Sequence, residues 1–266
     1  MISINEMINL EMIKGYDYTN AKAKVCQDII LKAIAMSSLN RNVTIKGGVV
    51  MRSKTNNIRR TTQDLDLDFI KYSIDDVAID DFISKLNCLE NITIRRYGKI
   101  EELKQQDYKG KRLYIEIKDF EGNSIINKLD LGVHNRLDIE QEEYCFEVCF
   151  DEEGASLLIN SSEQMFTEKL KSLLRFGAIS TRYKDIFDMY FLMKTIDKEK
   201  LKNCIKSYIY NDSMMREINS MELVERVKKT FQNKMYVQHL CSTKDKWLDE
   251  DIDIILNELI TFLESL

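Results

Sequence analysis

Proline is absent from the 266-residue chain, and glycine occurs only nine times. Flexible linkers between domains are usually rich in proline, glycine and serine, so no linker of this kind divides the sequence. Internal repeats and low-complexity tracts are absent too. Any domain boundary must therefore show as a change in hydrophobic pattern.

Histidine and paired cysteines are also scarce. The chain has two histidines, and its six cysteines include no Cys-x-x-Cys pair, so no zinc site is expected and the thiols are predicted to be reduced. No apolar run is long enough to span a bilayer, and residues 1–15 lack the apolar core of a signal peptide. These absences predict a cytoplasmic protein with no membrane partner.

The overall composition, 44% hydrophobic and 31% charged, is ordinary for a globular protein, and the net charge is −5. The charge is unevenly spread, because residues 161–246 carry 17 Lys and Arg against 11 Asp and Glu. A basic segment suits a polyanionic partner such as RNA, although solvated helices show the same excess without binding anything.

The most informative stretch combines a glycine pair with alternating carboxylates. An apolar run at 43–45 predicts a strand, Gly47 and Gly48 follow it, and a polar loop then leads to a second strand. On that strand Asp64, Asp66 and Asp68 alternate with apolar residues. Residues two apart on a strand share a face and lie about 6.6 Å apart, so three negative charges crowd one side.

Two interpretations fit this stretch. An ordinary half-buried strand with a solvated acidic face gives the same alternation. A divalent cation would relieve the repulsion, and an EF-hand is excluded because Phe69 and Asp75 stand where its glycine and glutamate belong. Backbone N–H groups at Gly47 and Gly48 can contact phosphate oxygens without a Cβ in the way. The pattern therefore predicts a site for phosphate and metal.

The N-terminal part, residues 1–155, is predicted to be an α/β domain. Ser73 is expected to cap a helix at 74–86, and Glu121-Gly122-Asn123 predicts a hairpin turn. Asp130, between two leucines, is an outward-facing surface residue or a third metal ligand or base if its strand neighbours Asp66. The other predicted elements are a helix at 18–38 and strands at 92–97, 112–117, 125–133 and 144–150.

After Gly154 the hydrophobic period becomes helical, so residues 156–266 are predicted to form a helical domain. Lys169 shares its helix face with apolar residues. Either its long side chain carries the ammonium out to water, or the ammonium supplies a positive charge that binds phosphate. Replacing it by methionine is expected to leave folding unharmed. Asp188 lies among apolar residues and needs a partner, for which Arg175 or Arg182 is expected. Predicted helices cover 162–175, 183–193, 198–209, 213–234 and 249–265.

Four motifs occur in an order that resembles the AbiEii/MenT nucleotidyltransferase toxins, of the DNA polymerase β-like superfamily. They are Gly47-Gly48, Arg60-Thr61-Thr62-Gln63-Asp64-Leu65-Asp66, Glu168-Lys169-Leu170 and Arg182-Tyr183-Lys184-Asp185-x-x-Asp188. The family pattern has Ser where Thr62 stands, Ala where Ser172 stands and Arg where Lys184 stands. Asp68 is additional to the pattern.

The resemblance implies an α+β fold, with a polymerase β-like mixed-sheet domain followed by a helical bundle that completes the NTP site. It implies transfer of a nucleotide from an NTP to RNA, at a tRNA 3′ end, by the toxin of a toxin–antitoxin or abortive-infection system with a cognate antitoxin. A non-catalytic nucleotide-binding module and a small-molecule, antibiotic-type nucleotidyltransferase remain alternatives.

The same resemblance implies residue roles. Asp64 and Asp66 hold Mg²⁺ or Mn²⁺, with Asp130 as the third ligand or base. Contacts to the phosphates come from Gly47, Gly48, Thr62 and Lys169. Asp185 orients Lys169 or reads the base, and Arg182 and Asp188 brace this part of the nucleotide-binding site.

Overall fold

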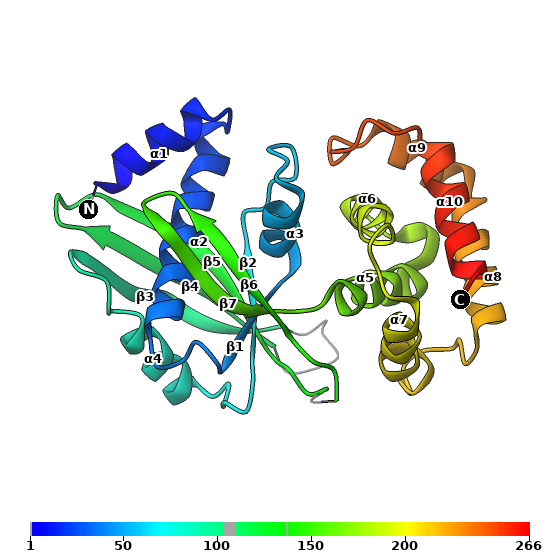
Figure 1. Cartoon of the computed structure of the whole chain (residues 1–266), viewed down its shortest axis with the longest axis horizontal. Coiled ribbons are helices and arrows are strands. Elements are labelled where there is room, and N and C mark those ends of the chain that lie inside the picture. Colours follow the sequence, from blue (N-terminus) through cyan, green and yellow to red (C-terminus); the bar gives the residue numbers. More distant parts are fainter. Residues whose placement is uncertain (1, 104–109, 137) are drawn as a thin grey trace. The chain divides into compact units, whose positions relative to one another are not determined.

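The structure, a computed structural model, describes residues 2–103, 110–136 and 138–266. These residues form two compact units, Met1–Asn160 and Ser161–Leu266, each with its own apolar core (Figure 1). The first unit combines helices with a mixed sheet, and the second is built of helices. The predicted α+β fold class is therefore confirmed.

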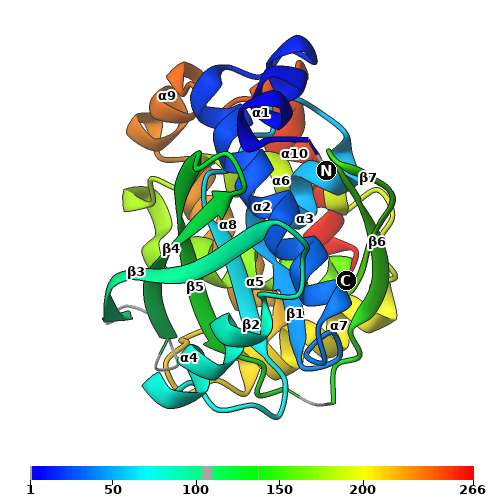
Figure 2. The same cartoon turned by 90° about the vertical axis from the view of Figure 1, so that its left-hand side faces the viewer.

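Within the described residues, seven strands of the first unit form one sheet in the order β3-β4-β5-β2-β1-β7-β6 (Figure 2). Strand β1 runs antiparallel to β2 and parallel to β7, and β2 runs parallel to β5. The remaining neighbours pair antiparallel. The strands are β1 Val43–Lys46, β2 Leu65–Phe69, β3 Ile92–Leu103, β4 Gly110–Asp119, β5 Ser124–Val133, β6 Glu142–Val148 and β7 Asp151–Ile159.

Helix α2 (Tyr18–Met36) is the most deeply buried helix of the first unit, with both apolar and polar side chains removed from water. It contacts β5, β6 and β7 and also packs against α1 (Ile4–Ile13). Helix α3 (Gly47–Thr55) contacts β1 and β2, and α4 (Asp76–Lys85) contacts β3. Phe69 on β2 meets Phe82 of α4 edge to face, with 5.1 Å between ring centroids, so the apolar side of β2 faces the core.

Several elements differ from the sequence-based expectation. Helix α1 was not predicted, although Ser3 and Glu6 form a capping box at its start. Helix α4 begins at Asp76 because the Asp75 side chain caps it, and Ser73 instead donates a hydrogen bond to Asp75. Strand β7 continues to Ile159, beyond the point at which helices were expected.

The helices of the second unit begin with α5 after the N-cap Ser161. The predicted helix at 198–209 divides into α7 and a π-helical turn, Lys206–Tyr210, and the predicted helix at 213–234 is much shorter than expected. None of the helices in the described ranges is both long and apolar enough to cross a membrane. The helices are α5 Ser162–Phe176, α6 Tyr183–Leu192, α7 Lys198–Ile205, α8 Ser220–Phe231, α9 Lys234–Ser242 and α10 Ile252–Glu264, with a 3₁₀ turn at Gly177–Ile179.

Asp119, at the end of β4, fastens the first helix to the sheet. Its carboxylate accepts hydrogen bonds from the backbone N–H of Ile4 at 2.8 Å, of Glu121 at 3.0 Å and of Asn123 at 2.9 Å. Burial by itself raises the pKa of the Asp119 carboxyl, but hydrogen bonds from Asn123 and Ile4 outweigh it and hold the pKa below its usual value. The ionised carboxylate of Asp119 is therefore the form that stabilises the contact between α1 and the end of β4.

We expect Asp119→Ala to lower the free energy of unfolding at pH 7 by about 2 kcal/mol, since charge-assisted hydrogen bonds are lost. Because the folded pKa is lowered, the wild-type contribution is complete above the unfolded pKa of about 3.9 and is lost as pH falls toward the folded pKa. Urea unfolding at pH 7 and pH 3 should thus show the two proteins converging at the lower pH. A difference that does not change with pH would contradict the assignment.

Candidate active site

Four carboxylates gather on one face at the centre of the sheet. Asp66 and Asp68 lie on β2, and Asp64 precedes the strand by one residue, so all three alternate with the buried Leu65 and Leu67. In the parallel β2–β5 register, Asp66 pairs with Asp130. Side chains paired across neighbouring strands point to the same face, so Asp130 joins this set. We call Asp64, Asp66 and Asp130 the carboxylate group.

The glycine pair lies so close to Asp66 and Thr62 that neither glycine has room for a Cβ. Gly47 has φ +67°, and a Cβ on it would overlap the Asp66 carboxylate, whereas a Cβ on Gly48 would overlap the Thr62 hydroxyl. Helix α3 starts at Gly47, and its N-cap, Lys46, makes no capping side-chain hydrogen bond. Helix N-terminal N–H groups attract anions. The first turn of α3 thus lies beside Thr62 and Asp66.

Each of three carboxylates on this face has a cation beside it. Lys128 Nζ is 2.8 Å from Asp64, whose side chain is 42% exposed, and Lys46 Nζ is 2.6 Å from Asp68. Arg112 grips both oxygens of Asp130, each at 2.8 Å, and this contact raises the pKa of the guanidinium. The exposed Asp64 pair contributes little stability and can exchange readily.

The three members of the carboxylate group are not all close to one another. Within the residues that the structure describes, the three carboxylates do not all lie within 4.8 Å of one another. A tighter set, Glu11, Asp28 and Cys149, does meet that distance. Lysine and arginine side chains already pair with its two carboxylates, and burial raises the pKa of the Cys149 thiol, so this set forms a buried ion-pair network.

In the helical unit, the predicted residues form a second cluster around Lys169. Its ammonium lies 2.9 Å from Asp185 and 2.8 Å from Asp188, while Arg182 contacts the other oxygen of Asp185 at 2.7 Å. The side chain of Asp188 is fully buried and that of Lys169 is 9% exposed. Burying such charges is costly unless they are paired, and here each has a partner.

Two sequence-based expectations about this cluster can be compared with the structure. Of the two interpretations of Lys169, the one in which its ammonium reaches water is wrong, because the side chain and its acidic partners are buried. Asp188 is paired with Lys169 and also accepts a hydrogen bond from Trp247 Nε1 at 3.1 Å, and a contact with Arg175 or Arg182 stays a prediction. Lys169→Met would therefore remove a cation from two buried carboxylates, and we no longer expect it to fold as well as the wild type.

The model of the nucleotidyl transferase AbiEii toxin family, of the type IV toxin–antitoxin system, matches residues 29–258. The chain belongs to this family. Its predicted membership is thereby confirmed, and nucleotidyl transfer is the activity that membership assigns. The match extends over the carboxylate group, the glycine pair and the Lys169 cluster.

The AbiEii chain matches no curated protein sequence. An antigenic nucleotidyltransferase-like protein from Paracoccidioides brasiliensis is 14% identical, with a TM-score of 0.49, over 80% of this chain and 92% of that one. The solution structure of the antibiotic-resistance factor ANT(2'')-Ia is 15% identical, with a TM-score of 0.43, over 71% of this chain and 92% of that one. Likenesses this weak support no statement about function.

Sequence reasoning missed the basic partners in the AbiEii chain's carboxylate group. Lys128 and Asp130 alternate on β5 as Asp64 and Asp66 do around β2, so a shared face was visible in the sequence. The position of Arg112 was not, because it depends on β4 pairing with β5. Sequence reasoning also missed Trp247, which donates a hydrogen bond to Asp188. The one feature that could have drawn attention to this residue is that it is the single tryptophan of the chain.

Proposed function

We propose that this AbiEii-family chain transfers a nucleotide from an NTP to a hydroxyl group of RNA, with the 3′ end of a tRNA as the expected acceptor, and that it needs a divalent metal ion. The acceptor hydroxyl gives up its proton to solvent, its oxygen forms a bond to the α-phosphorus, the bond from that phosphorus to the bridging oxygen breaks, and pyrophosphate leaves. The observation that carries the proposal is the glycine pair at the start of α3 beside Thr62 and Asp66.

Oxygen donors on the acidic face suit Mg²⁺ or Mn²⁺, which prefer carboxylate ligands. Asp64 and Asp66 would hold the ion, since Asp66 lies beside Gly47 and the exposed Asp64 can exchange Lys128 for a metal. When bound, the ion would neutralise charge on the phosphate oxygens. Arg112 contacts both oxygens of Asp130. We therefore propose that Asp130 contributes negative charge beside the metal ion and does not take the proton from the RNA hydroxyl.

The chain's own groups supply phosphate contacts. The N–H groups of Gly47 and Gly48 and the Thr62 hydroxyl are proposed to bind phosphate oxygens. Lys169 is proposed to contribute positive charge to the triphosphate, with Asp185 orienting its ammonium. Arg182 and Asp188 brace this cluster. The family's type IV toxin–antitoxin description supports a cognate antitoxin as the partner.

The deciding experiment supplies each of four α-labelled NTPs to the purified protein with bulk RNA, protein and small-molecule acceptors in parallel. We expect label on RNA only, release of pyrophosphate, and no transfer after EDTA treatment. Label on a small molecule would move the assignment to an antibiotic-type enzyme. NTP binding without any transfer would indicate a non-catalytic nucleotide-binding module.

RNA binding should also depend on salt if basic residues 161–246 contact phosphates. The log of the binding constant is expected to fall linearly with log salt, with a slope of roughly −0.7 per phosphate contact for single strands. Charge reversal at Lys228 and Lys229, which lie on α8, should flatten the slope. Binding that does not change with salt would contradict this use of the basic segment.

A further inference from the structure

Gln27, in the buried part of α2, joins the two backbone segments that carry the candidate site. We propose that Gln27 and Arg52 form a clamp, here named the α2 clamp, that fixes the Thr62–Asp64 segment against α3 and so positions Asp64 for metal binding. The inference rests on the proposed function. Gln27 acts through other groups, so we assign it as a positioning residue.

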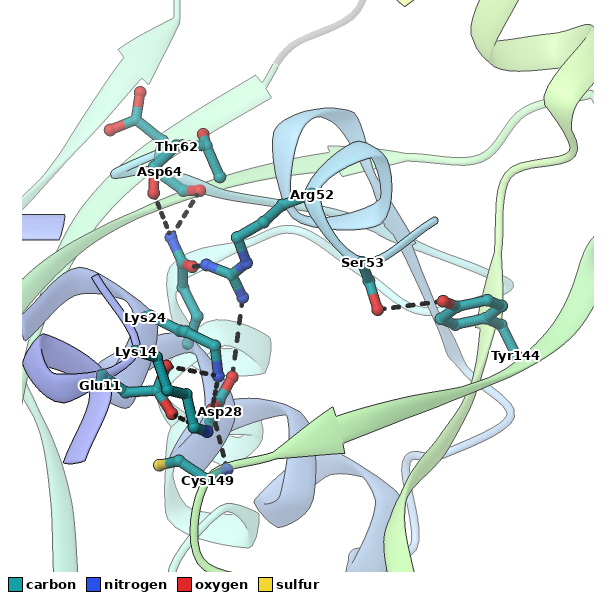
Figure 3. Close-up of polar contacts among 11 residues, drawn as sticks. Glu11, Lys14, Lys24, Asp28, Arg52, Ser53, Thr62, Asp64, Tyr144 and Cys149 are labelled. Carbon is teal, nitrogen blue, oxygen red and sulfur yellow. Dashed lines mark hydrogen bonds and ion pairs between the residues drawn. The ribbon is translucent and has the colours of Figure 1, made fainter. Parts of the chain in front are cut away.

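The contacts of the α2 clamp run from one segment to the other. The side-chain amide Nε2 of Gln27 donates hydrogen bonds to the carbonyl oxygens of Thr62 at 3.1 Å and Asp64 at 3.2 Å. Its Oε1 accepts a hydrogen bond from Nη1 of Arg52, on α3. Figure 3 labels Arg52, Thr62 and Asp64, the three residues that this side chain contacts. The helix that begins with the glycine pair and the loop that bears Thr62 and Asp64 are thus held by one side chain.

The chemistry of these partners makes glutamine the residue that fits. A guanidinium only donates hydrogen bonds and a backbone carbonyl oxygen only accepts them, so the amide must present its oxygen to Arg52 and its nitrogen to the loop. Glutamate has the same shape but would place an oxygen opposite two carbonyl oxygens. Methionine has a similar length and would make neither contact.

Burial makes the α2 clamp rigid. Gln27 is 0% exposed and Arg52 is 7% exposed, so water cannot readily replace a broken contact. Arg52 is also 3.6 Å from the buried carboxylate of Asp28, which contacts Lys24 at 2.6 Å and the N–H of Cys149 at 3.0 Å. Burial by itself lowers the pKa of Lys24, but its contact with Asp28 outweighs this, and the pKa is raised. The clamp is therefore anchored in the ion-pair network beneath it.

The two residues of the α2 clamp hold different parts of the candidate site. Arg52 holds α3, whose first turn is proposed to contact phosphate, and Gln27 holds the carbonyl groups of the segment that ends in Asp64. A shift of the loop would change the separation of the Asp64 and Asp66 carboxylates. Partners that orient metal ligands commonly contribute a factor of about 10–100 to metal affinity or activity.

The test compares wild type with Gln27→Glu and Gln27→Met in two measurements that need no turnover. Mn²⁺ binding is followed by electron paramagnetic resonance, and hydrogen–deuterium exchange is measured for peptides covering residues 61–66. We expect both variants to bind Mn²⁺ about tenfold more weakly or worse. We also expect faster exchange in residues 61–66, and partial recovery of nucleotide transfer at high Mn²⁺ concentration.

Lys32→Met is the matched control. Lys32 is buried on the same helix, donates a hydrogen bond to the carbonyl oxygen of Gly154 at 2.9 Å and lies 2.6 Å from the Asp151 carboxylate, both on β7. It should lose thermal stability to a similar extent without a change in Mn²⁺ affinity or in exchange at residues 61–66. The same pattern in this control as in the Gln27 variants would overturn the proposal, because a general loss of stability would then explain both.

Wild-type exchange at residues 61–66 in both Gln27 variants would also overturn the α2 clamp. Should the wild-type protein transfer nucleotide to no acceptor, the proposed function fails, yet exchange at residues 61–66 still decides whether the clamp exists. Gln27→Met settles the case in which Gln27→Glu does not fold or takes up a proton. The two failures are thereby distinguished.

Discussion

Asp66→Asn is expected to abolish nucleotide transfer while leaving the protein folded. Asp66 is the member of the carboxylate group that lies beside Gly47 and pairs with Asp130 across β2 and β5. Replacing a metal ligand by a neutral amide removes several kcal/mol of charge stabilisation. This corresponds to a loss of roughly a thousandfold or more in the transfer rate. Neutralising one of several neighbouring carboxylates also relieves repulsion, so the melting temperature should change little.

Asp68→Asn provides the matched control for this experiment. Asp68 lies two residues further along the same strand face, but it is buried and paired with Lys46 at 2.6 Å. We expect this variant to lose stability because a buried pair is broken, whereas the folded fraction should retain transfer. Initial rates with labelled NTP and Mg²⁺, combined with thermal melts, separate the two outcomes. Near-wild-type transfer by Asp66→Asn would show that the metal assignment is wrong.

Lys169→Met is expected to destabilise the protein by about 3 kcal/mol, since removing one partner of a buried ion pair leaves an uncompensated charge. The loss falls at the low end of the usual range because Arg182 still contacts Asp185 and Trp247 still donates to Asp188. The double variant Lys169→Met with Asp188→Asn should recover part of the stability, since the two residues are coupled. Urea unfolding of the single and double variants measures the coupling.

Nucleotide affinity then separates packing from function at Lys169. If the ammonium also neutralises the triphosphate, the stabilised double variant should still bind NTP more weakly than wild type. Lys171→Met serves as the comparison. Lys171 lies two residues after Lys169 on the same helix and forms an ion pair with Asp212. Full recovery of NTP affinity together with stability would assign Lys169 a structural role alone.

The alternation around β2 was predictable because it is local. Strand period alone placed Asp64, Asp66 and Asp68 on one side and the apolar residues on the other, and the glycine pair required no knowledge of distant contacts. The pairing of Asp66 with Asp130 could only be stated conditionally, because strand order is decided by packing of the whole sheet. The same reason hid the position of Arg112 and the pairing of Lys128 with Asp64, although the face that Lys128 shares with Asp130 was visible in the sequence.

Strand β7 shows where local pattern fails. Its second half, residues 155–159, is a short, mostly apolar run, and such a run fits a helix as well as a strand. What makes it a strand is pairing with β1 on one side and β6 on the other. Gln27 was hidden differently, since a polar residue in a helix gives no sign of the backbone carbonyl groups that it will meet.

The order of strands in the sheet has a consequence for synthesis of the toxin. The β1–β2 pair, which carries the glycine pair and Asp66, is translated early, but β5 and β7, which flank that pair, come much later. Pairings between segments far apart in sequence form slowly, because a long loop must close first. A nascent chain that has not yet produced β7, which ends at Ile159, therefore lacks the neighbour of β1 on one side, and the glycine pair and Asp66 are supported on both sides only after translation has passed this strand.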